Sequence, residues 1–280
     1  MIIIKSKREI ELMREPCKVT AELLHDLAEF IRPGISTMDV NDFVEKRITG
    51  HGMTPTFKGY GGFPAAACVS VNDEVIHGIP NASRILKEGD IVSVDVGATC
   101  KGYNSDAART YPVGTISAED QKLIDVTRQS FFEGIKYAMV GYRIGDIGHA
   151  VQKYAESFGM SVIRDYTGHG TGTKLHEDPY IPNYGKPGKG AKIERGMTLA
   201  IEPMIALGSY DVRVLGNDWT VVMRDGKKSA HYENTILVTD GEPEILTLQY
   251  EGRNGKKQHY RGNGHRYRCA AERNVQGEAG

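Results

Sequence analysis

Four acidic side chains lie within or beside apolar segments of the sequence, two in each half of the chain. Asp95 interrupts a run of aliphatic residues and Asp106 follows 11 positions later, while Glu202 and Glu233 stand beside similar runs in the second half. Burying a carboxylate is costly unless it is paired or bound to a metal. Any one of these acids taken alone is more often a solvated surface group, but four in this arrangement favour a shared metal site.

The spacing of Asp95 and Asp106 predicts that their carboxylates face each other. The midpoint between them falls between Cys100 and Lys101. If residues 92–111 form a hairpin that turns there, the two acids are direct cross-strand partners, with Cβ atoms about 5 Å apart. Two bare carboxylates this close repel each other, or one of them retains a proton. A divalent cation between them would remove that conflict.

An imidazole completes the predicted site. His169 lies in a segment, 167–172, where glycines alternate with other residues, and His176 follows seven positions later. Such glycines allow the backbone to approach a ligand or a second chain segment closely. A lone loop histidine is more often structural, but here it accompanies four acids. Ligands of this hardness suit Mn, Fe, Co or Zn, and two ions about 3.5–4 Å apart can activate a bridging water and polarise a carbonyl.

Three other motifs that carry chemistry are absent from the sequence. His176-Glu177 does not begin an H-E-x-x-H zinc site, because Tyr180 stands where the second histidine would be. There is no phosphate-binding G-x-x-x-x-G-K-[ST] loop, and no G-x-S-x-G turn of the kind that carries a nucleophilic serine. These absences favour the metal site over nucleotide or serine-hydrolase chemistry.

A weak internal repeat at an offset of 107 residues relates the two pairs of acids. The identical positions are Gly34/Gly141, Asp39/Asp146, Val44/Val151, Lys46/Lys153, Gly52/Gly159 and Met53/Met160. The same offset places Asp95 on Glu202. Two related halves that each supply a carboxylate at the same point of an apolar strand predict one site shared between them.

Helical and strand patterns occur in matching blocks along the two halves. Helices are predicted over 7–31, with a kink or break at Pro16, and over 36–48, 117–139 and 144–158. Strands are predicted over 67–71, 91–96, 104–111, 198–205, 219–223 and 231–238. This pattern indicates an α+β fold, with a largely antiparallel curved sheet and helices covering one face.

Composition is typical of a globular protein outside the last segment. The 280 residues carry a net charge of −1, and no apolar run approaches the roughly 18 residues that span a bilayer. The four cysteines form no C-x-x-C pair, which favours reduced thiols in a cytoplasmic protein. The apolar stretch at 1–5 is too short for a signal peptide. We expect one catalytic domain over 1–248.

Residues 249–280 are expected to form a disordered, basic tail. From Glu251 onward there are seven Lys and Arg against three Asp and Glu, with few large aliphatic residues. The alternative is a basic arm that contacts RNA or another acidic surface. The preceding part of the chain shows no basic stripe, so DNA binding is not expected.

These residues together resemble the bacterial type I methionine aminopeptidases, of the pita-bread metallopeptidase family, from about residue 3 to about residue 248. The matching segments are Val75-Ile76-His77-Gly78-Ile79-Pro80, Val94-Asp95-Val96-Gly97, Asn104-Ser105-Asp106, Gly168-His169-Gly170-x-Gly172-x-x-x-His176-Glu177-x-Pro179, Ile201-Glu202-Pro203 and Tyr232-Glu233-x-Thr235. The resemblance implies a pseudo-twofold pita-bread fold, in agreement with the repeat.

The resemblance also implies roles for individual residues. Its five ligands to two divalent ions would be Asp95, Asp106, His169, Glu202 and Glu233. Asp106 and Glu233 would bridge the ions, Asp95 would bind one, and His169 with Glu202 the other. A metal-bridging hydroxide would attack the carbonyl of an N-terminal methionine, with Glu202 as proton shuttle. His77 would contact the substrate near the scissile amide, and His176 would stabilise the oxyanion.

A methionine pocket is implied as well. It would be formed by Tyr60, Phe63, Cys68, Leu175 and Trp219, although Cys68 and Leu175 could equally be plain core residues. The implied substrates are peptides and nascent proteins with a small second residue. The sequence departs from the family pattern at His231, where glutamine is usual, and at Leu175, where an aromatic residue is common.

Three alternatives stay open at this point. A proline-directed relative, such as prolidase or aminopeptidase P, typically carries an extra N-terminal domain, whereas here the helical pattern begins at about residue 7. A non-catalytic pita-bread binding protein usually lacks ligands that this chain keeps. Transient ribosome contact through the tail is compatible with catalysis, and no membrane partner is expected.

Overall fold

The computed structural model describes residues 1–248, and the predicted tail at 249–280 lies outside the described residues. Met1–Leu248 forms one compact unit. The predicted α+β architecture is confirmed. None of the helices in this part of the chain is long and apolar enough to cross a membrane.

Four helices correspond to the four predicted ones. They are α1 (Lys7–Phe30), α2 (Thr37–Gly50), α3 (Ala118–Ile135) and α4 (Ile144–Glu156). Ser6 begins α1 with a capping box, in which its hydroxyl accepts from the Glu9 amide and its own amide donates to the Glu9 carboxylate. The helix continues through Pro16 instead of ending there. Pro16 is buried between Met13 and Cys17, and tertiary packing of this face offsets the lost backbone hydrogen bond.

The strands are short, and every pair is antiparallel. They are β1 (Thr54–Pro55), β2 (Ala67–Val71), β3 (Glu74–Ile76), β4 (Ile91–Val96), β5 (Ala98–Cys100), β6 (Tyr103–Asn104), β7 (Ala107–Pro112), β8 (Ser161–Val162), β9 (Gly168–Gly170), β10 (Glu177–Ile181), β11 (Thr198–Ile201), β12 (Met204–Ala206), β13 (Val212–Val214), β14 (Val221–Met223), β15 (Ser229–His231), β16 (Asn234–Leu237) and β17 (Glu244–Ile245). The largest sheet of the described residues has five strands in the order β10-β9-β11-β16-β17, and β2-β4-β7 is one of four three-stranded sheets. The predicted strands at 67–71 and 91–96 are confirmed.

Three strands that the sequence predicts as continuous are each divided in two. The break between β6 and β7 contains Asp106, the break between β11 and β12 contains Glu202, and the break between β15 and β16 contains Glu233. The prediction of unbroken strands at 104–111, 198–205 and 231–238 was therefore wrong. Where the backbone leaves the regular strand pairing, a side chain can point in a direction that the alternating faces of a strand would not allow.

The hairpin between Asp95 and Asp106 turns one residue later than predicted. Strand β4 pairs Asp95 with Ala108, and β5 pairs Cys100 with Tyr103. The turn is centred on Lys101 and Gly102, whose φ angles of 50° and 81° are typical of a type I′ hairpin turn. Asp95 is therefore not the direct partner of Asp106. Moving the turn by one residue shifts each cross-strand partner by two positions, so that Ala108 instead of Asp106 lies opposite Asp95.

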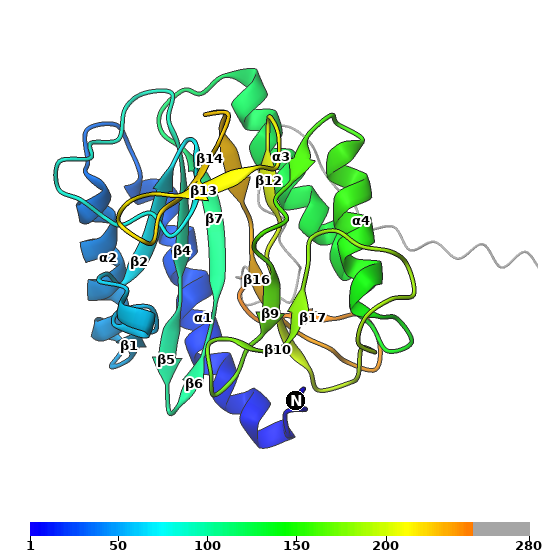
Figure 1. The fold of residues 1–280 in the computed structure, drawn as a ribbon. Coiled ribbons are helices and arrows are strands. Elements are labelled where there is room, and N and C mark those ends of the chain that lie inside the picture. The colour runs from blue at the N-terminus through cyan, green and yellow to red at the C-terminus, as the bar shows by residue number, and fades with distance from the viewer. Residues whose placement is uncertain (249–280) are drawn as a thin grey trace, which may run out of the picture. The chain divides into compact units, whose positions relative to one another are not determined.

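The predicted repeat is visible in the fold. Helices α2 and α4 begin 107 residues apart, and so do strands β4 and β11. Strand β4 lies between β2 and β7, as β11 lies between β9 and β16. In Figure 1, α2 and α4 lie at the two sides of the molecule, with the central strands running between them. The two halves thus place equivalent strands at the middle of one unit.

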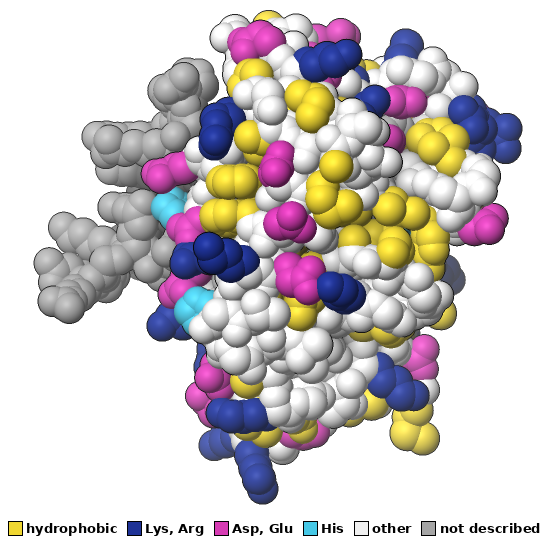
Figure 2. Space-filling model, turned by 90° about the vertical axis from the view of Figure 1, so that its left-hand side faces the viewer, with side chains coloured by type: hydrophobic (Ala, Val, Ile, Leu, Met, Phe, Trp, Pro, Cys, Tyr) yellow, Lys and Arg dark blue, Asp and Glu magenta, His cyan; other side chains and the backbone are white. Residues whose placement is uncertain are grey.

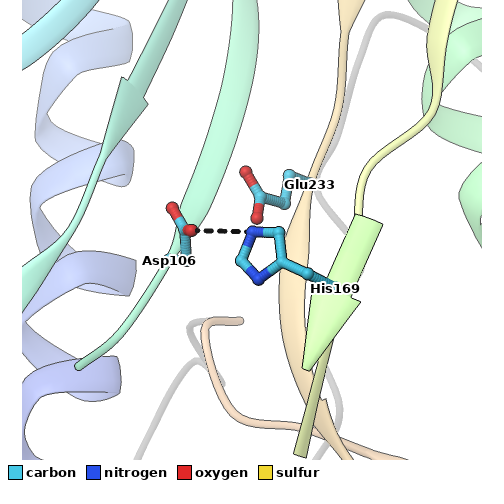
Figure 3. Close-up of side chains that lie close together, drawn as sticks. All are labelled: Asp106, His169 and Glu233. Atoms are coloured by element: carbon cyan, nitrogen blue, oxygen red, sulfur yellow. Dashed lines mark ion pairs between the residues drawn. The ribbon is translucent and has the colours of Figure 1, made fainter. Parts of the chain in front are cut away.

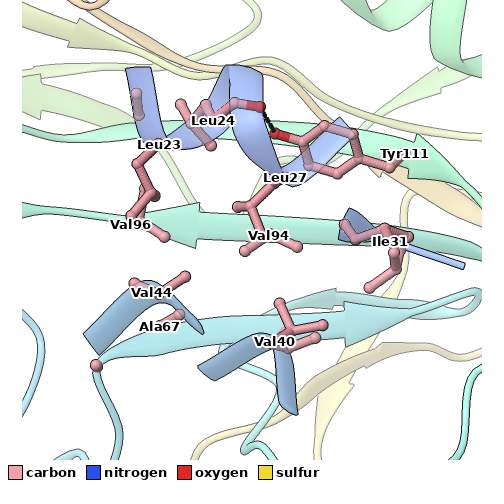
Figure 4. Packing of buried hydrophobic residues seen from close by; sticks show 14 of the residues in the cluster. Leu23, Leu24, Leu27, Ile31, Val40, Val44, Ala67, Val94, Val96 and Tyr111 are labelled. Carbon is pink, nitrogen blue, oxygen red and sulfur yellow. Dashed lines mark hydrogen bonds between the residues drawn. The ribbon is translucent and has the colours of Figure 1, made fainter. Parts of the chain in front are cut away.

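Helices α1 and α2 hold the first-half strands through a tightly packed apolar layer. Leu27 and Val44 are fully buried against Val94 of β4, and the Tyr111 hydroxyl of β7 donates to the Leu24 carbonyl at 2.6 Å (Figure 4). A fully buried side chain of this size contributes about 1.5–3 kcal/mol to folding. This layer fixes strand β4 and therefore Asp95.

The face shown in Figure 2 carries acidic and basic side chains in an interspersed pattern, with hydrophobic side chains between them. A stripe of one sign is not seen on this face.

Candidate metal centre

Asp106, His169 and Glu233 converge from separate parts of the chain. One ligand atom from each lies within 4.8 Å of the other two, and all three residues are buried. Figure 3 shows the three side chains pointing toward one another. Asp106 precedes β7, His169 lies on β9, and Glu233 lies between β15 and β16.

Glu202 and Asp95 adjoin this group. The His169 Nε2 atom lies 3.5 Å from Asp106 Oδ2 and 3.5 Å from Glu202 Oε1. The carboxyl groups of Asp95 and Asp106 are close enough to act strongly on each other. The structure thus brings together all five side chains that the sequence suggested as ligands.

Burial dominates the electrostatics of the group. Desolvation raises the pKa of Asp106 to about 8. Desolvation, and then repulsion by the other carboxylates, raise the pKa values of Asp95, Glu202 and Glu233 well above their usual range. Desolvation lowers the pKa of His169 to about 4, so its imidazole is neutral. Four carboxyl groups that resist ionisation beside a neutral imidazole form a site that gains from a cation.

The residues present fit a divalent metal ion. Asp95 Oδ1, Asp106 Oδ1 and Glu233 Oε1 are buried without a hydrogen-bond partner among the described residues. Buried carboxylate oxygens rarely go unpartnered. The His169 Nδ1 atom lies 2.8 Å from the Gly170 carbonyl, which fixes the ring with Nε2 toward the carboxylates. An imidazole nitrogen and unpartnered carboxylate oxygens are suitable donors for Mn, Fe, Co or Zn.

The glycines beside His169 allow close packing of the sheet. A Cβ on Gly168 would lie 2.4 Å from the Ala200 carbonyl oxygen, and one on Gly170 would lie 2.3 Å from that of Asp178. Strand β9 is thus held between β10 and β11 with no space for a side chain at either glycine. The sequence suggested that these glycines let the backbone approach either a ligand or a second chain segment. In the structure they allow the neighbouring chain segments to approach closely.

Side-chain hydrogen bonds to the backbone fix the acids, and those at Asp106 and Glu233 join the two halves. The Thr235 hydroxyl donates to the Asp106 carbonyl at 2.8 Å and accepts from the Asp106 amide at 3.2 Å. The Arg109 guanidinium donates to the Glu233 carbonyl at 2.5 Å, and the Asn183 amide to that of Glu202 at 2.9 Å. Sequence reasoning missed Arg109 and Asn183 because neither stands in an informative local pattern.

His77 and His176 lie near the carboxylate group and are linked to aromatic side chains. The His176 ring centroid is 4.3 Å from that of His169, and His176 Nδ1 lies 2.8 Å from the Tyr60 hydroxyl. His77 contacts Trp219, with ring centroids 6.1 Å apart. Its φ of 58° is uncommon for a non-glycine residue. Burial lowers the pKa of each of these two histidines to about 4, which leaves both neutral.

An apolar cluster adjoins these histidines. It consists of Phe57, Phe63, Ala65, Cys68 and Leu175, with Ile79 and Trp219 packed against it. Four of the predicted pocket residues are thus in one cluster, and Tyr60 adjoins it through His176. Phe57, Ala65 and Ile79 were missed, because single apolar residues in a loop carry no periodic signal. Cys68 pairs with Asp95 across β2 and β4, which places the cluster next to the acids.

His231 extends the group of polar side chains. Its Nε2 atom lies 3.8 Å from both Glu202 Oε2 and Glu233 Oε2, and it has no hydrogen-bond partner among the described residues. The backbone amide of His231 donates to Thr110 Oγ1, whose hydroxyl donates back to the His231 carbonyl, both at 2.9 Å. The departure from the family pattern at this position suggested an extra polar group, and the structure places the His231 ring beside two of the acids.

Known proteins that resemble this chain carry the same architecture. The family model for metallopeptidase family M24 matches residues 11–240. A methionine aminopeptidase of Clostridium acetobutylicum is 54% identical over 248 residues, which cover 89% of this chain and 99% of that protein. The structure of a methionine aminopeptidase from Thermotoga maritima superposes with a TM-score of 0.87 at 48% identity, covering 89% of this chain and all of that one.

A prolidase from Pyrococcus furiosus shares the fold at greater distance. It superposes with a TM-score of 0.73 at 22% identity, and the match covers 89% of this chain but 66% of the prolidase. A likeness at that identity shows the fold alone. The methionine aminopeptidases match this chain at higher identity and over nearly their whole length. The chain therefore belongs to metallopeptidase family M24 and, within it, to the methionine aminopeptidases.

Proposed function

We propose that this methionine aminopeptidase removes the N-terminal methionine from peptides and nascent chains with a small second residue, using two divalent ions. The observation that carries the proposal is the convergence of Asp95, Asp106, His169, Glu202 and Glu233, whose buried oxygens include several without partners. Family membership already implies a metal. The number of ions and their identity, among Mn, Fe, Co and Zn, belong to the proposal.

Each ligand has a proposed place. Asp106 and Glu233 would contact both ions, Asp95 one of them, and His169 with Glu202 the other. The His169 Nε2 atom lies 3.5 Å from a carboxylate oxygen of Asp106 and 3.5 Å from one of Glu202, which supports the assignment of His169 and Glu202 to the same ion. When bound, divalent ions supply the charge that activates water and polarises a peptide carbonyl. We assign the transfer of a proton to the Glu202 carboxyl group, which is 9% exposed and borders the site.

The neighbouring histidines and apolar cluster would bind the substrate. His176 is anchored through Nδ1 by Tyr60, which leaves Nε2 to donate to a carbonyl oxygen as negative charge develops there. His77 would contact the peptide beside the scissile amide. The methionine side chain would enter the cluster that contains Phe63, Cys68 and Leu175, with Trp219 at its edge and Tyr60 beside His176.

Release of methionine tests this function. Purified protein with added Mn, Co or Fe is expected to release methionine from Met-Ala peptides, and the Glu202→Ala variant to release it at least about 100-fold more slowly, as for loss of one catalytic acid–base group. An X-Pro peptide is the control for prolidase-type activity. Preference for X-Pro would favour the proline-directed alternative, and no metal-dependent release from either peptide would favour a non-catalytic binding protein.

We also propose a cytoplasmic location and transient contact with the ribosome through 249–280, which suits an enzyme acting on nascent chains. The excess of Lys and Arg after Glu251 supports this contact. Deletion of 251–280 should abolish co-sedimentation with ribosomes while peptide cleavage continues. Unchanged co-sedimentation would refute the contact without affecting the proposed activity.

A further inference from the structure

A buried ion pair joins the N-terminal segment to the strand that follows His176. The Lys5 and Glu177 side chains are 3% and 2% exposed, and Lys5 Nζ lies 2.5 Å from Glu177 Oε2. Lysine and glutamate are almost never buried this completely without a partner. Replacing one of them leaves the other charge buried and unpaired. The pair therefore constrains both segments strongly.

The Glu177 carboxylate also organises the loop that precedes it. Its Oε1 atom accepts from the Lys174 amide at 3.2 Å and from the Thr173 hydroxyl at 3.5 Å. In the β9–β10 pair, Glu177 lies opposite Gly170, and Gly170 directly follows His169 in the sequence. One carboxylate thus ties the loop 171–177 to Lys5, while its backbone is paired beside the metal centre.

Lys5 is itself fixed on two sides. Its amide donates to the Gly196 carbonyl at 2.9 Å, just before β11. A Cβ on Gly172 would lie 2.6 Å from Lys5 Cε and 2.7 Å from Glu177 Oε1. The Gly172 carbonyl accepts from both the amide and the side chain of Asn104, at 2.9 and 3.0 Å. The loop is therefore wedged between the ion pair and the segment that leads to Asp106.

This loop carries two residues of the proposed substrate site. Leu175 belongs to the apolar cluster, and the His176 ring contacts that of His169 edge to face, with ring centroids 4.3 Å apart. We propose that Lys5, through Glu177, is a positioning residue, which sets the place of His176 and Leu175 relative to the metal centre. The inference rests on the proposed function, since it concerns how that site is assembled. Neither side chain of the pair need touch the substrate.

Five variants separate positioning from general stability. Lys5→Met removes the ammonium at similar length, Glu177→Gln removes the carboxylate charge, and the double variant leaves no buried charge. Val44→Ala, at a fully buried position of the first-half core, is the control for lost stability remote from the loop. Lys101→Met, which breaks the exposed pair with Glu15, is the control for loss of an ion pair.

We expect Lys5→Met to lower kcat for Met-Ala peptides by about 10-fold to 100-fold, because a displacement of about 1 Å at a reacting group has that effect. Its affinity for Mn²⁺, measured by calorimetry, should stay within about twofold, because the five proposed ligands remain. Amide exchange should accelerate within 171–177. The decrease in kcat of the double variant should be smaller than the decreases of the two single variants combined, because the effects of residues in contact are coupled. Both controls should retain kcat when assayed well below their unfolding temperatures.

Equal kcat for Lys5→Met and Val44→Ala at matched fractions folded would overturn the proposal, as would unchanged amide exchange in 171–177. If Lys5→Met does not fold, Lys5→Arg keeps the charge but displaces the loop, and full activity in that variant would overturn the proposal instead. Failure of the wild-type protein to release methionine would refute the proposed function, while the exchange measurement would still report on the pair.

Discussion

At the scale of single residues, the four buried carboxyl groups determine how metal and protons compete. The pKa of Asp106 is raised to about 8, and those of Asp95, Glu202 and Glu233 are raised well above their usual range, all mainly by burial. Metal-free folded protein therefore binds more protons than the unfolded chain, in which these groups titrate near pH 4. Their stabilising contribution is present below about pH 4 and is lost as pH rises toward 8.

The first prediction concerns this pH dependence. The increase in unfolding temperature on adding Mn²⁺ to chelator-treated protein should grow from pH 5 to pH 8, because metal replaces protons at the acids. Scanning calorimetry at each pH measures it. Asp106→Asn is the matched control, in which the increase should be smaller throughout. An increase that is constant or shrinks as pH rises would contradict the account.

His231 is the second residue with a testable role. Its Nε2 atom lies 3.8 Å from a carboxylate oxygen of Glu202 and 3.8 Å from one of Glu233, so it is a polar neighbour of both acids. We predict that His231→Leu weakens Mn²⁺ affinity by about 10-fold, as expected when a partner of a ligand is removed. His231→Gln, which keeps a hydrogen-bonding side chain, should lose less. Equal affinities in a calorimetric titration of all three proteins would exclude the role.

The residue scale also shows how far the sequence could predict the site. Asp95, Asp106, Glu202 and Glu233 could be singled out because acids beside apolar strands are unusual, and His169 because of the glycines around it. Phe57 and Asn183 could not, since nothing local distinguishes an apolar loop residue or an amide that will face the site. Their place depends on tertiary contacts between segments distant in sequence.

At the scale of elements, the strand boundaries explain where prediction succeeded and where it failed. Strands β2 and β4 have the predicted bounds, because each is a largely buried run that is followed by Asn72 or Gly97. The runs at 198–205 and 231–238 become apolar again after Glu202-Pro203 and after Glu233-Asn234, so the pattern predicted each of them as one strand. Each break nonetheless contains a candidate ligand. An acid inside an apolar strand is thus a signal for a break as well as for a site.

A substitution on β9 tests the role of strand packing. Gly170→Ala would place a Cβ 2.3 Å from the Asp178 carbonyl oxygen, where only backbone movement can relieve the contact. We predict a loss of at least about 2 kcal/mol in the free energy of unfolding, within the range for overpacking, and weaker Mn²⁺ binding because His169 moves with the strand. Denaturant unfolding and calorimetry measure the two effects. Gly50→Ala, where nothing lies within 4 Å, is the control, and equal effects would contradict the account.

At the scale of the whole described unit, the two halves are joined through the site. Asp95 and Asp106 come from the first half, and His169, Glu202 and Glu233 come from the second. The Thr235–Asp106 backbone contacts and the Arg109–Glu233 contact cross the same boundary. Metal binding would therefore stabilise the unit as a whole instead of one half. The repeat in the sequence predicted this sharing, although it could not predict the contacts that hold the halves in register.

The most direct test of the central claim is a crystal of the protein grown with Mn²⁺ and measured near the manganese absorption edge. The account predicts two anomalous peaks per chain, both within coordination distance of the group formed by Asp95, Asp106, His169, Glu202 and Glu233. Peaks elsewhere, or no peak among these five side chains at saturating Mn²⁺, would contradict it.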